Sequence, residues 1–349
     1  MPNASLLTFY LSPLFAQRGP NVRLDARTYI LLATVVTVLL VLNVIGWLLR
    51  RQPESTASPA VVRTFNNRVR AWLLMYSILI AGLILGYVAT VVLFGLISFW
   101  ALREFITMTP TRRGDHRTLF MTFTIFAPLQ YILVGWGNYD LYSIMIPVYA
   151  SLLIPTGIAI SGDPKRFLER VAKIQAALLI CVYCLSHAPA LLNLLLTTGR
   201  GGPRWVIGAT ADPPLYGSNA SVLFFLVLIV QLNDVFQYMW SQLLGKHVIA
   251  PQINASRTWE GLIGGTVSTV AVGMLLIWAT PFGYWAGPIA GVVALAGFAG
   301  SMTMSAIKRD RNVKDYGTLV SGHAGVLDRI DSLCFAAPVF FHITRFFFT

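Results

Sequence analysis

The sequence predicts an all-α, polytopic integral membrane protein. Of its 349 residues, 56% are apolar and only 11% are charged, and the mean hydropathy is +0.67. Soluble domains carry about 25% charged residues, so this composition excludes an ordinary soluble fold. The apolar residues also gather into stretches close to the roughly 20 residues that a helix needs to cross a bilayer.

Ten of these stretches are expected to be transmembrane helices. In chain order they are Tyr29–Leu49, Ala71–Gly86, Val88–Phe105, Thr118–Trp136, Leu141–Ile160, Ile174–Leu196, Ser221–Trp240, Leu262–Ala279, Ala286–Met304 and Leu333–Phe348. The second and third are short and nearly continuous, so nine spans is the alternative count.

The first span stands apart from the others. Residues 1–28 lack the basic segment that opens a secretory signal, so we expect them to be retained. A polar linker that contains proline and serine follows the first span at 52–62. We therefore divide the chain into an N-terminal extension with the first span and its linker (1–70) and a membrane domain (71–349).

Basic residues fall mainly on one side of this topology. With ten spans, twenty of the 26 Lys and Arg residues lie in loops on one face and six on the other. Positive charge marks the cytoplasmic side, so both termini are expected outside. The net charge of +12 follows from this asymmetry and from attraction to anionic lipids. We expect no nucleic-acid partner, because no soluble domain is available to hold a duplex.

The densest charge lies at 305–331, which holds five basic and four acidic side chains. Cations can hold phosphate oxygens and carboxylates can hold Mg²⁺, so this segment is typical of metal-assisted phosphate chemistry. Asp328 and Asp331 are three residues apart and can converge on one ion, and His323 lies among small residues, where it can contact phosphate or act as an acid or base. The alternative is a cytoplasmic loop whose charges pair with one another and with lipid phosphates.

A second candidate group surrounds Asp234, at the end of a long apolar run. An aspartate at membrane depth is costly and suggests function, although a helix-end carboxylate bonded to its neighbours would also explain it. Lys246 and Arg257 are the two cations of the following loop and are candidate phosphate ligands, or ordinary flanking charges. Glu104, at the end of another span, is expected to pair locally with Arg103.

In the charged segment 305–331 and in the segment that begins at Asp234, the sequence resembles a divergent member of the phosphatidate cytidylyltransferase (CDP-diacylglycerol synthase) family. The family signature, written loosely, is S-x-x-K-R-x4-K-D-x-G-x4-G-H-G-G-x-x-D-R-x-D. It is matched, with every gap preserved, by Ser305, Lys308, Arg309, Lys314, Asp315, Gly317, Gly322, His323, Gly325, Asp328, Arg329 and Asp331.

The segment that begins at Asp234 also falls in register with the family, but it departs from the usual pattern. Arg257 stands where the family has lysine, Gln237 and Ser241 replace small residues, and Ala324 replaces a glycine. None of these changes removes a charge. They put the lipid preference in doubt more than the chemistry.

The resemblance implies that CTP and phosphatidate react to give CDP-diacylglycerol and pyrophosphate. It implies Mg²⁺, and a second metal or a monovalent cation is also possible. The catalytic residues that the resemblance implies are Lys314, Asp315, His323, Asp328 and Asp331. The implied metal ligands are Asp234, Asp315, Asp328 and Asp331. The implied substrate-binding residues are Ser305, Lys308, Arg309, Arg329, Lys246 and Arg257. The phosphatidate would come from the inner leaflet of the cytoplasmic membrane, to an active site that faces the cytoplasm. The resemblance also implies a homodimer.

Three other functions are compatible with parts of the pattern. A paralogue could activate another lipid phosphate, such as a polyprenyl phosphate, or use another nucleotide. A lipid or ion transporter could use Asp234 as an ion relay, but it predicts inverted repeats and broken helices, which the sequence does not show. A catalytically inactive scaffold is disfavoured by the intact carboxylates.

Overall fold

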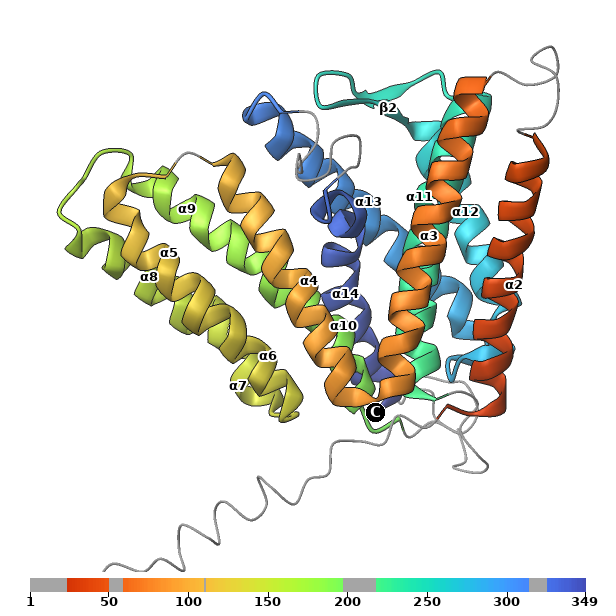
Figure 1. The fold of residues 1–349 in the computed structure, drawn as a ribbon, viewed down its shortest axis with the longest axis horizontal. Coiled ribbons are helices and arrows are strands. Elements are labelled where there is room, and N and C mark those ends of the chain that lie inside the picture. The colour runs from red at the N-terminus through yellow and green to blue at the C-terminus, as the bar shows by residue number, and fades with distance from the viewer. Residues whose placement is uncertain (1–23, 50–58, 110, 197–217, 314–324) are drawn as a thin grey trace, which may run out of the picture.

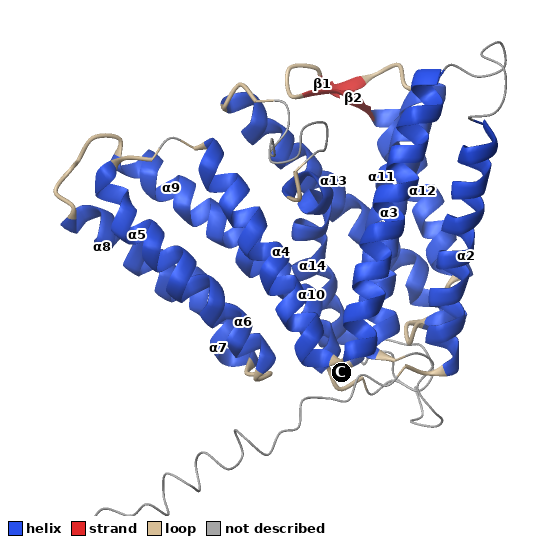
Figure 2. Cartoon of the chain, in the orientation of Figure 1, coloured by secondary structure: helices blue, strands red, loops and turns tan. Residues whose placement is uncertain are grey.

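The computed structural model describes residues 24–49, 59–109, 111–196, 218–313 and 325–349. These residues are almost entirely helical and include one two-stranded hairpin (Figure 2). Eight of the described helical segments are long and apolar enough to cross a bilayer. The predicted class, an all-α polytopic membrane protein, is confirmed.

The N-terminal half is a series of long helices, several of which contain a turn of π-helix. Its elements are α2 (Ala26–Leu49), α3 (Pro59–Leu85), α4 (Tyr87–Met108), η1 (Arg113–Asp115), α5 (His116–Met121), η2 (Thr122–Phe126), α6 (Ala127–Gly135), α7 (Tyr139–Ile144), η3 (Met145–Ala150), α8 (Ser151–Ile160), α9 (Phe167–Ala177), η4 (Leu178–Cys184), α10 (Leu185–Ala190) and η5 (Leu191–Asn193).

The C-terminal half contains the hairpin and the largely buried helix α11. Its elements are α11 (Asn219–Leu244), β1 (Val248–Ala250), β2 (Asn254–Thr258), α12 (Trp259–Leu275), η6 (Ile277–Ala279), η7 (Gly283–Trp285), α13 (Ala286–Asp310) and α14 (Leu327–Phe348). The antiparallel strands β1 and β2 pair Val248 with Thr258 and Ala250 with Asn254.

The two short predicted spans at the start of the membrane domain are separate helices. Gly86 lies between α3 and α4 with φ of 103°, a backbone conformation that glycine adopts without strain. The chain therefore turns back at this point, and the nine-span alternative does not hold there. Two predicted spans fall on shorter apolar helices, Val69–Leu85 within α3 and the 17-residue α12, which lie at the lower limit of length for a span.

The helices α11 to α14 form the part of the molecule that carries the site. In this group α11 packs along α12, α12 along α13, and α13 along α14. Glycines allow two of these contacts to be close: a Cβ on Gly265 would lie 2.4 Å from the Gln237 side chain, and one on Gly300 would lie 2.7 Å from the backbone oxygen of Asp331. Small residues at such positions let helices in a membrane approach closely.

The described loops separate into two groups at opposite ends of the helices (Figure 1). The hairpin, the end of α13, the start of α5 and the junction of α8 with α9 lie at one end. The α3–α4 turn, the α6–α7 turn and the C-terminus lie at the other. This arrangement matches the alternation from which the basic and less basic faces were predicted.

Candidate active site

A polar cavity of about 270 Å³ lies beside the hairpin, whose strand β2 forms part of its wall. Five elements contribute to it: α3, α11, β2, α13 and α14. It is lined by Trp72, Gln231, Asp234, Val235, Tyr238, Asn254, Ser256, Arg257, Ser301, Asp328, Arg329 and Asp331. Segments nearly 100 residues apart in the sequence thus bring three aspartates and two arginines to one cavity.

Asp234 lies on the cavity side of α11, where Arg257 of β2 binds it. The Arg257 Nη2 atom donates a hydrogen bond to Asp234 Oδ1 at 3.0 Å. The same guanidinium donates to Gln237 Oε1 at 2.6 Å and to Ser301 Oγ at 2.8 Å. A planar guanidinium can donate in several directions at once, so Arg257 joins β2 to both α11 and α13.

Asn233, the residue before Asp234, anchors α11 to the neighbouring helices α12 and α13. The buried Asn233 amide donates to the backbone oxygen of Ala294 on α13 at 3.0 Å. Its Oδ1 accepts hydrogen bonds from Gln237 at 3.1 Å and from Thr269 on α12 at 3.3 Å. Asn233 therefore locks α11, α12 and α13 together one residue before the aspartate of the cavity.

Asp328 and Asp331 enter the cavity from the first turns of α14, as their spacing predicted. Lys308 Nζ on α13 donates to Asp328 Oδ1 at 2.8 Å, and the backbone N–H of Gly325 donates to Oδ2 at 3.3 Å. Asp331 Oδ1 accepts the N–H and the hydroxyl hydrogen bonds of Ser332, at 2.7 and 3.3 Å. Asp331 and Asp234 line the same cavity.

The hairpin that carries Arg257 is held by its own contacts. Thr258 caps α12 by accepting the N–H of Gly261 at 3.0 Å. Glu260, just before the predicted span at Leu262, accepts the backbone N–H groups of Lys246 and His247. The hydrogen bond from the His247 ring, together with those from backbone N–H groups, lowers the pKa of Glu260 to about 2.

The other predicted site residues border the cavity or lie away from it. Ser305 accepts a hydrogen bond from Asn254 of the cavity wall at 3.2 Å. Arg309 donates to the backbone oxygen of Ile253 at 3.1 Å, at the turn of the hairpin. Lys246 does not line the cavity formed by the described residues. Lys314, Asp315 and His323 lie outside the described residues.

The lining includes residues that the sequence interpretation did not single out. Gln231 precedes Asp234 by three residues, and Ser301 precedes Ser305 by four, so helical spacing would have placed both on the correct face. Trp72 has no comparable signal, because it comes from α3, which is distant in the sequence.

Glu104 is the clearest difference from the prediction. Its carboxylate does not pair with Arg103; both are described residues, and the Arg103 guanidinium lies over the Trp100 ring instead. The carboxylate accepts the backbone N–H groups of Val326 and Leu327, at the start of α14. The predicted local ion pair is wrong, because adjacent residues on a helix do not face each other.

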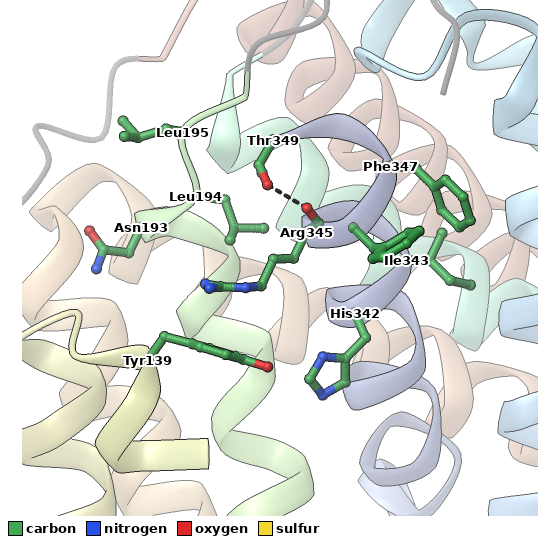
Figure 3. A pocket seen from close by; sticks show the side chains of 10 residues that line it. Tyr139, Asn193, Leu194, Leu195, His342, Ile343, Arg345, Phe347 and Thr349 are labelled. Atoms are coloured by element: carbon green, nitrogen blue, oxygen red, sulfur yellow. Dashed lines mark hydrogen bonds between the residues drawn. The ribbon is translucent and has the colours of Figure 1, made fainter. Parts of the chain in front are cut away.

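A larger cavity, of about 1150 Å³, is drawn in Figure 3. It is lined by residues of α7 and of the C-terminal end of α14, which lie at the end of the molecule opposite the hairpin (Figure 1). Its walls are mostly apolar, and the Arg345 guanidinium lies 3.4 Å from the centre of the Tyr139 ring. The described residues that line it include no aspartate or glutamate. It therefore lacks the carboxylates that a cation-dependent phosphate reaction needs, and the smaller cavity is the better candidate.

Comparison with known proteins identifies relatives along most of the chain. The model of the cytidylyltransferase family matches residues 66–347. An uncharacterized protein, YnbB, of Escherichia coli K12 is 35% identical over 322 residues, which are 90% of this chain and 97% of that protein. A phosphatidate cytidylyltransferase of Brucella abortus is 34% identical over 202 residues, 54% of this chain and 70% of that protein. One of Staphylococcus aureus is 34% identical over 120 residues, 34% of this chain and 46% of that protein.

Proposed function

This chain belongs to the cytidylyltransferase family, and we propose that it is a phosphatidate cytidylyltransferase. The nucleotidyltransferase class follows from the family and its named relatives. The observation that carries the choice of site is the cavity in which Asp234, Asp328 and Asp331 meet Arg257 and Arg329. A reaction between a nucleoside triphosphate and a lipid phosphate brings together two anions, so both cations and carboxylate-bound metal are required.

In the proposed reaction an oxygen of the phosphatidate phosphate attacks the α-phosphorus of CTP. A new bond forms between that oxygen and the α-phosphorus, and the bond from the α-phosphorus to the oxygen bridging to the β-phosphate breaks. Pyrophosphate leaves with that oxygen, and CDP-diacylglycerol is the other product. The side chains hold charge and align the groups, with no covalent intermediate on the protein.

The cations of the cavity are candidates for holding the phosphates. Arg329 is exposed and lines the cavity. Arg257 and Lys308 are bound to aspartates in this structure. We infer that phosphate oxygens compete for these two cations when substrate binds. Ser305 and Arg309 flank the same region, and Lys314 belongs to the proposed set although it lies outside the described residues.

The carboxylates fit Mg²⁺ only in combination with substrate. Among the described residues, no three acidic, histidine or cysteine side chains gather closely enough to bind an ion by themselves. Magnesium usually takes one or two protein carboxylates and completes its shell with phosphate oxygens and water. Asp234, Asp328 and Asp331, with Asp315 outside the described residues, are the proposed ligands. Bound Mg²⁺ would neutralise charge on the triphosphate.

The distribution of basic residues supports a cytoplasmic active site. The hairpin contributes residues to the cavity, and it lies at the same end of the helices as the other loops that are rich in Lys and Arg in the sequence (Figure 1). By the positive-inside rule this end faces the cytoplasm, where CTP is found. We therefore propose an inner-membrane enzyme that takes phosphatidate from the inner leaflet. The division of the chain at residue 70 and the homodimer stay predictions.

The test is transfer of label from CTP to lipid by the purified chain in detergent. With CTP labelled at the α-phosphate, the label should appear in CDP-diacylglycerol. Pyrophosphate should appear in an amount equal to that lipid product. CTP labelled at the γ-phosphate is the control and should leave the lipid unlabelled. Transfer to polyprenyl phosphate instead would identify a paralogue, and no transfer to any lipid phosphate would contradict the proposal.

A further inference from the structure

The start of α14 is held by a carboxylate from a distant helix. Glu104 lies one turn before the end of α4, and only 4% of its surface is exposed. Its Oε1 atom accepts the N–H of Val326 at 3.0 Å, and its Oε2 atom accepts the N–H of Leu327 at 2.8 Å. More than 220 residues separate the partners in the sequence. The Trp100 ring donates to Oε1 at 3.2 Å and orients the carboxylate from its own helix.

This contact replaces a cap that α14 does not supply. The first N–H groups of a helix have no partner within the helix, and a side chain of the preceding residue usually takes one of them. The residue in that position here is Val326, which has no polar side chain and makes no cap. A carboxylate is also favoured at the positive end of the helix dipole. The Glu104 carboxylate, on α4, therefore caps the N-terminus of α14 in place of a local side chain.

The residues that follow are those of the cavity. Asp328 comes one residue after Leu327, and Asp331 comes four residues after it, one helical turn along. Any shift of the first turn of α14 therefore moves both aspartates relative to Asp234 and Lys308. Glu104 does not itself line the cavity formed by the described residues.

We propose that Glu104 is a positioning residue, which fixes the first turn of α14 so that Asp328 and Asp331 are held in place for the reaction. The inference rests on the proposed function of the cavity. Supporting residues of this kind typically change metal affinity or activity by about 10–100-fold when they are replaced. A misplacement of about 1 Å can have an effect of similar size on turnover.

The test is Glu104→Gln, because glutamine has the same shape but only one acceptor oxygen. Its NH₂ group would meet one of the two backbone N–H groups. We expect kcat to fall by about 10–100-fold and the Mg²⁺ concentration for half-maximal rate to rise, with the KM for CTP within about twofold. Asp140→Asn, an acid-to-amide change at an exposed position on α7 at the other end of the molecule, is the matched control and should behave as the original protein.

Hydrogen–deuterium exchange of residues 325–331 gives a readout that does not depend on activity. The amides of Val326 and Leu327 should exchange faster in Glu104→Gln than in Asp140→Asn. If Glu104→Gln does not fold, Glu104→Asp takes its place, since the shorter chain keeps the charge but cannot reach both N–H groups. Unchanged kcat, unchanged Mg²⁺ dependence and unchanged exchange would overturn the inference. An original protein without transfer activity would instead contradict the proposed function, and exchange would still test the cap.

Discussion

Arg257 lies with its Nη1 atom 2.6 Å from Oε1 of Gln237, so two positions that depart from the family pattern are in direct contact. The sequence interpretation noted an arginine in place of lysine and a glutamine in place of a small residue as separate changes. The structure shows that one supplies a hydrogen-bond partner for the other. A third departure is next to them, since Ser241 bonds the hydroxyl of Thr258 at 3.0 Å. Two of the departures, at Arg257 and Gln237, are therefore matched to each other, whereas Ser241 bonds a residue that keeps the family pattern.

Arg257→Lys should lower activity although the resemblance implies lysine at this position. A lysine cannot reproduce the planar fork that contacts Gln237, Asp234 and Ser301 together. A hydrogen bond to a charged group contributes about 1.5–3 kcal/mol, so the loss of one should lower kcat/KM at least about tenfold. The measurement is label transfer from CTP to phosphatidate. Arg117→Lys, an exposed position on α5, is the control and should stay within about twofold.

Gln237→Ala should cause little further loss of kcat/KM when it is combined with Arg257→Lys. If the two residues act as one unit, the double variant is about as active as Arg257→Lys alone, because residues in contact give non-additive effects. Losses that simply multiply would show that the two departures are independent. Both single variants and the double variant are compared by kcat/KM under the same detergent conditions.

Asp331→Asn should reduce turnover by about a thousandfold or more while the protein stays folded. Asp331 lines the cavity together with Asp234, and the amide cannot replace a carboxylate as a ligand of a hard cation. Asp310→Asn is the matched control within the signature segment, because Asp310 is exposed and contacts Arg311 rather than the cavity. Asp315→Asn is expected to behave as Asp331→Asn does. Normal turnover in both Asp331→Asn and Asp315→Asn would remove the proposed metal ligands.

Removal of divalent cations should stop the reaction reversibly. The two reactants carry several negative charges, and Mg²⁺ usually completes its shell with phosphate oxygens and water, so we expect the proposed ion to bind with substrate and to exchange readily. EDTA should abolish label transfer, and excess Mg²⁺ should restore it to the starting rate. The thermal unfolding midpoint should hardly move in EDTA without substrate. A rate that does not change in chelator would point to a reaction that the basic residues support alone.

The parts of this site that the sequence predicted are those set by local spacing. Asp328 and Asp331 are three residues apart on a helix and both reach the cavity, as expected. The apolar lengths located the membrane helices, because each span must satisfy its own backbone. These inferences need only the geometry of one helix.

The parts that the sequence did not predict depend on contacts between distant elements. Glu104 was assigned to its neighbour in the chain, whereas the two backbone N–H groups that it binds come more than 220 residues later. Arg257 and Lys308 were predicted as phosphate ligands, and the structure shows which aspartate each one binds. No spacing rule connects α3 to the cavity, so Trp72 was not found. Tertiary packing decides these partners, and one sequence contains little information about it.

Gly300→Ala should disturb the site through packing rather than chemistry. A methyl group at Gly300 would lie 2.7 Å from the backbone oxygen of Asp331 and 2.9 Å from Cβ of Phe335, closer than atoms normally approach. Helix α14 would have to move away from α13, and overpacking of this kind typically costs about 1–3 kcal/mol. We expect a lower unfolding midpoint in detergent and a lower kcat, since Asp331 moves with the helix.

Gly297→Ala is the matched control one turn earlier, because the nearest neighbour of its new methyl group, Cβ of Ser332, would be at 3.5 Å. Alanine is about 0.5–1 kcal/mol more favourable than glycine inside a helix, so this control should be neutral or slightly stabilising. Equal behaviour of the two variants would mean that the close approach of α13 and α14 does not set the position of Asp331.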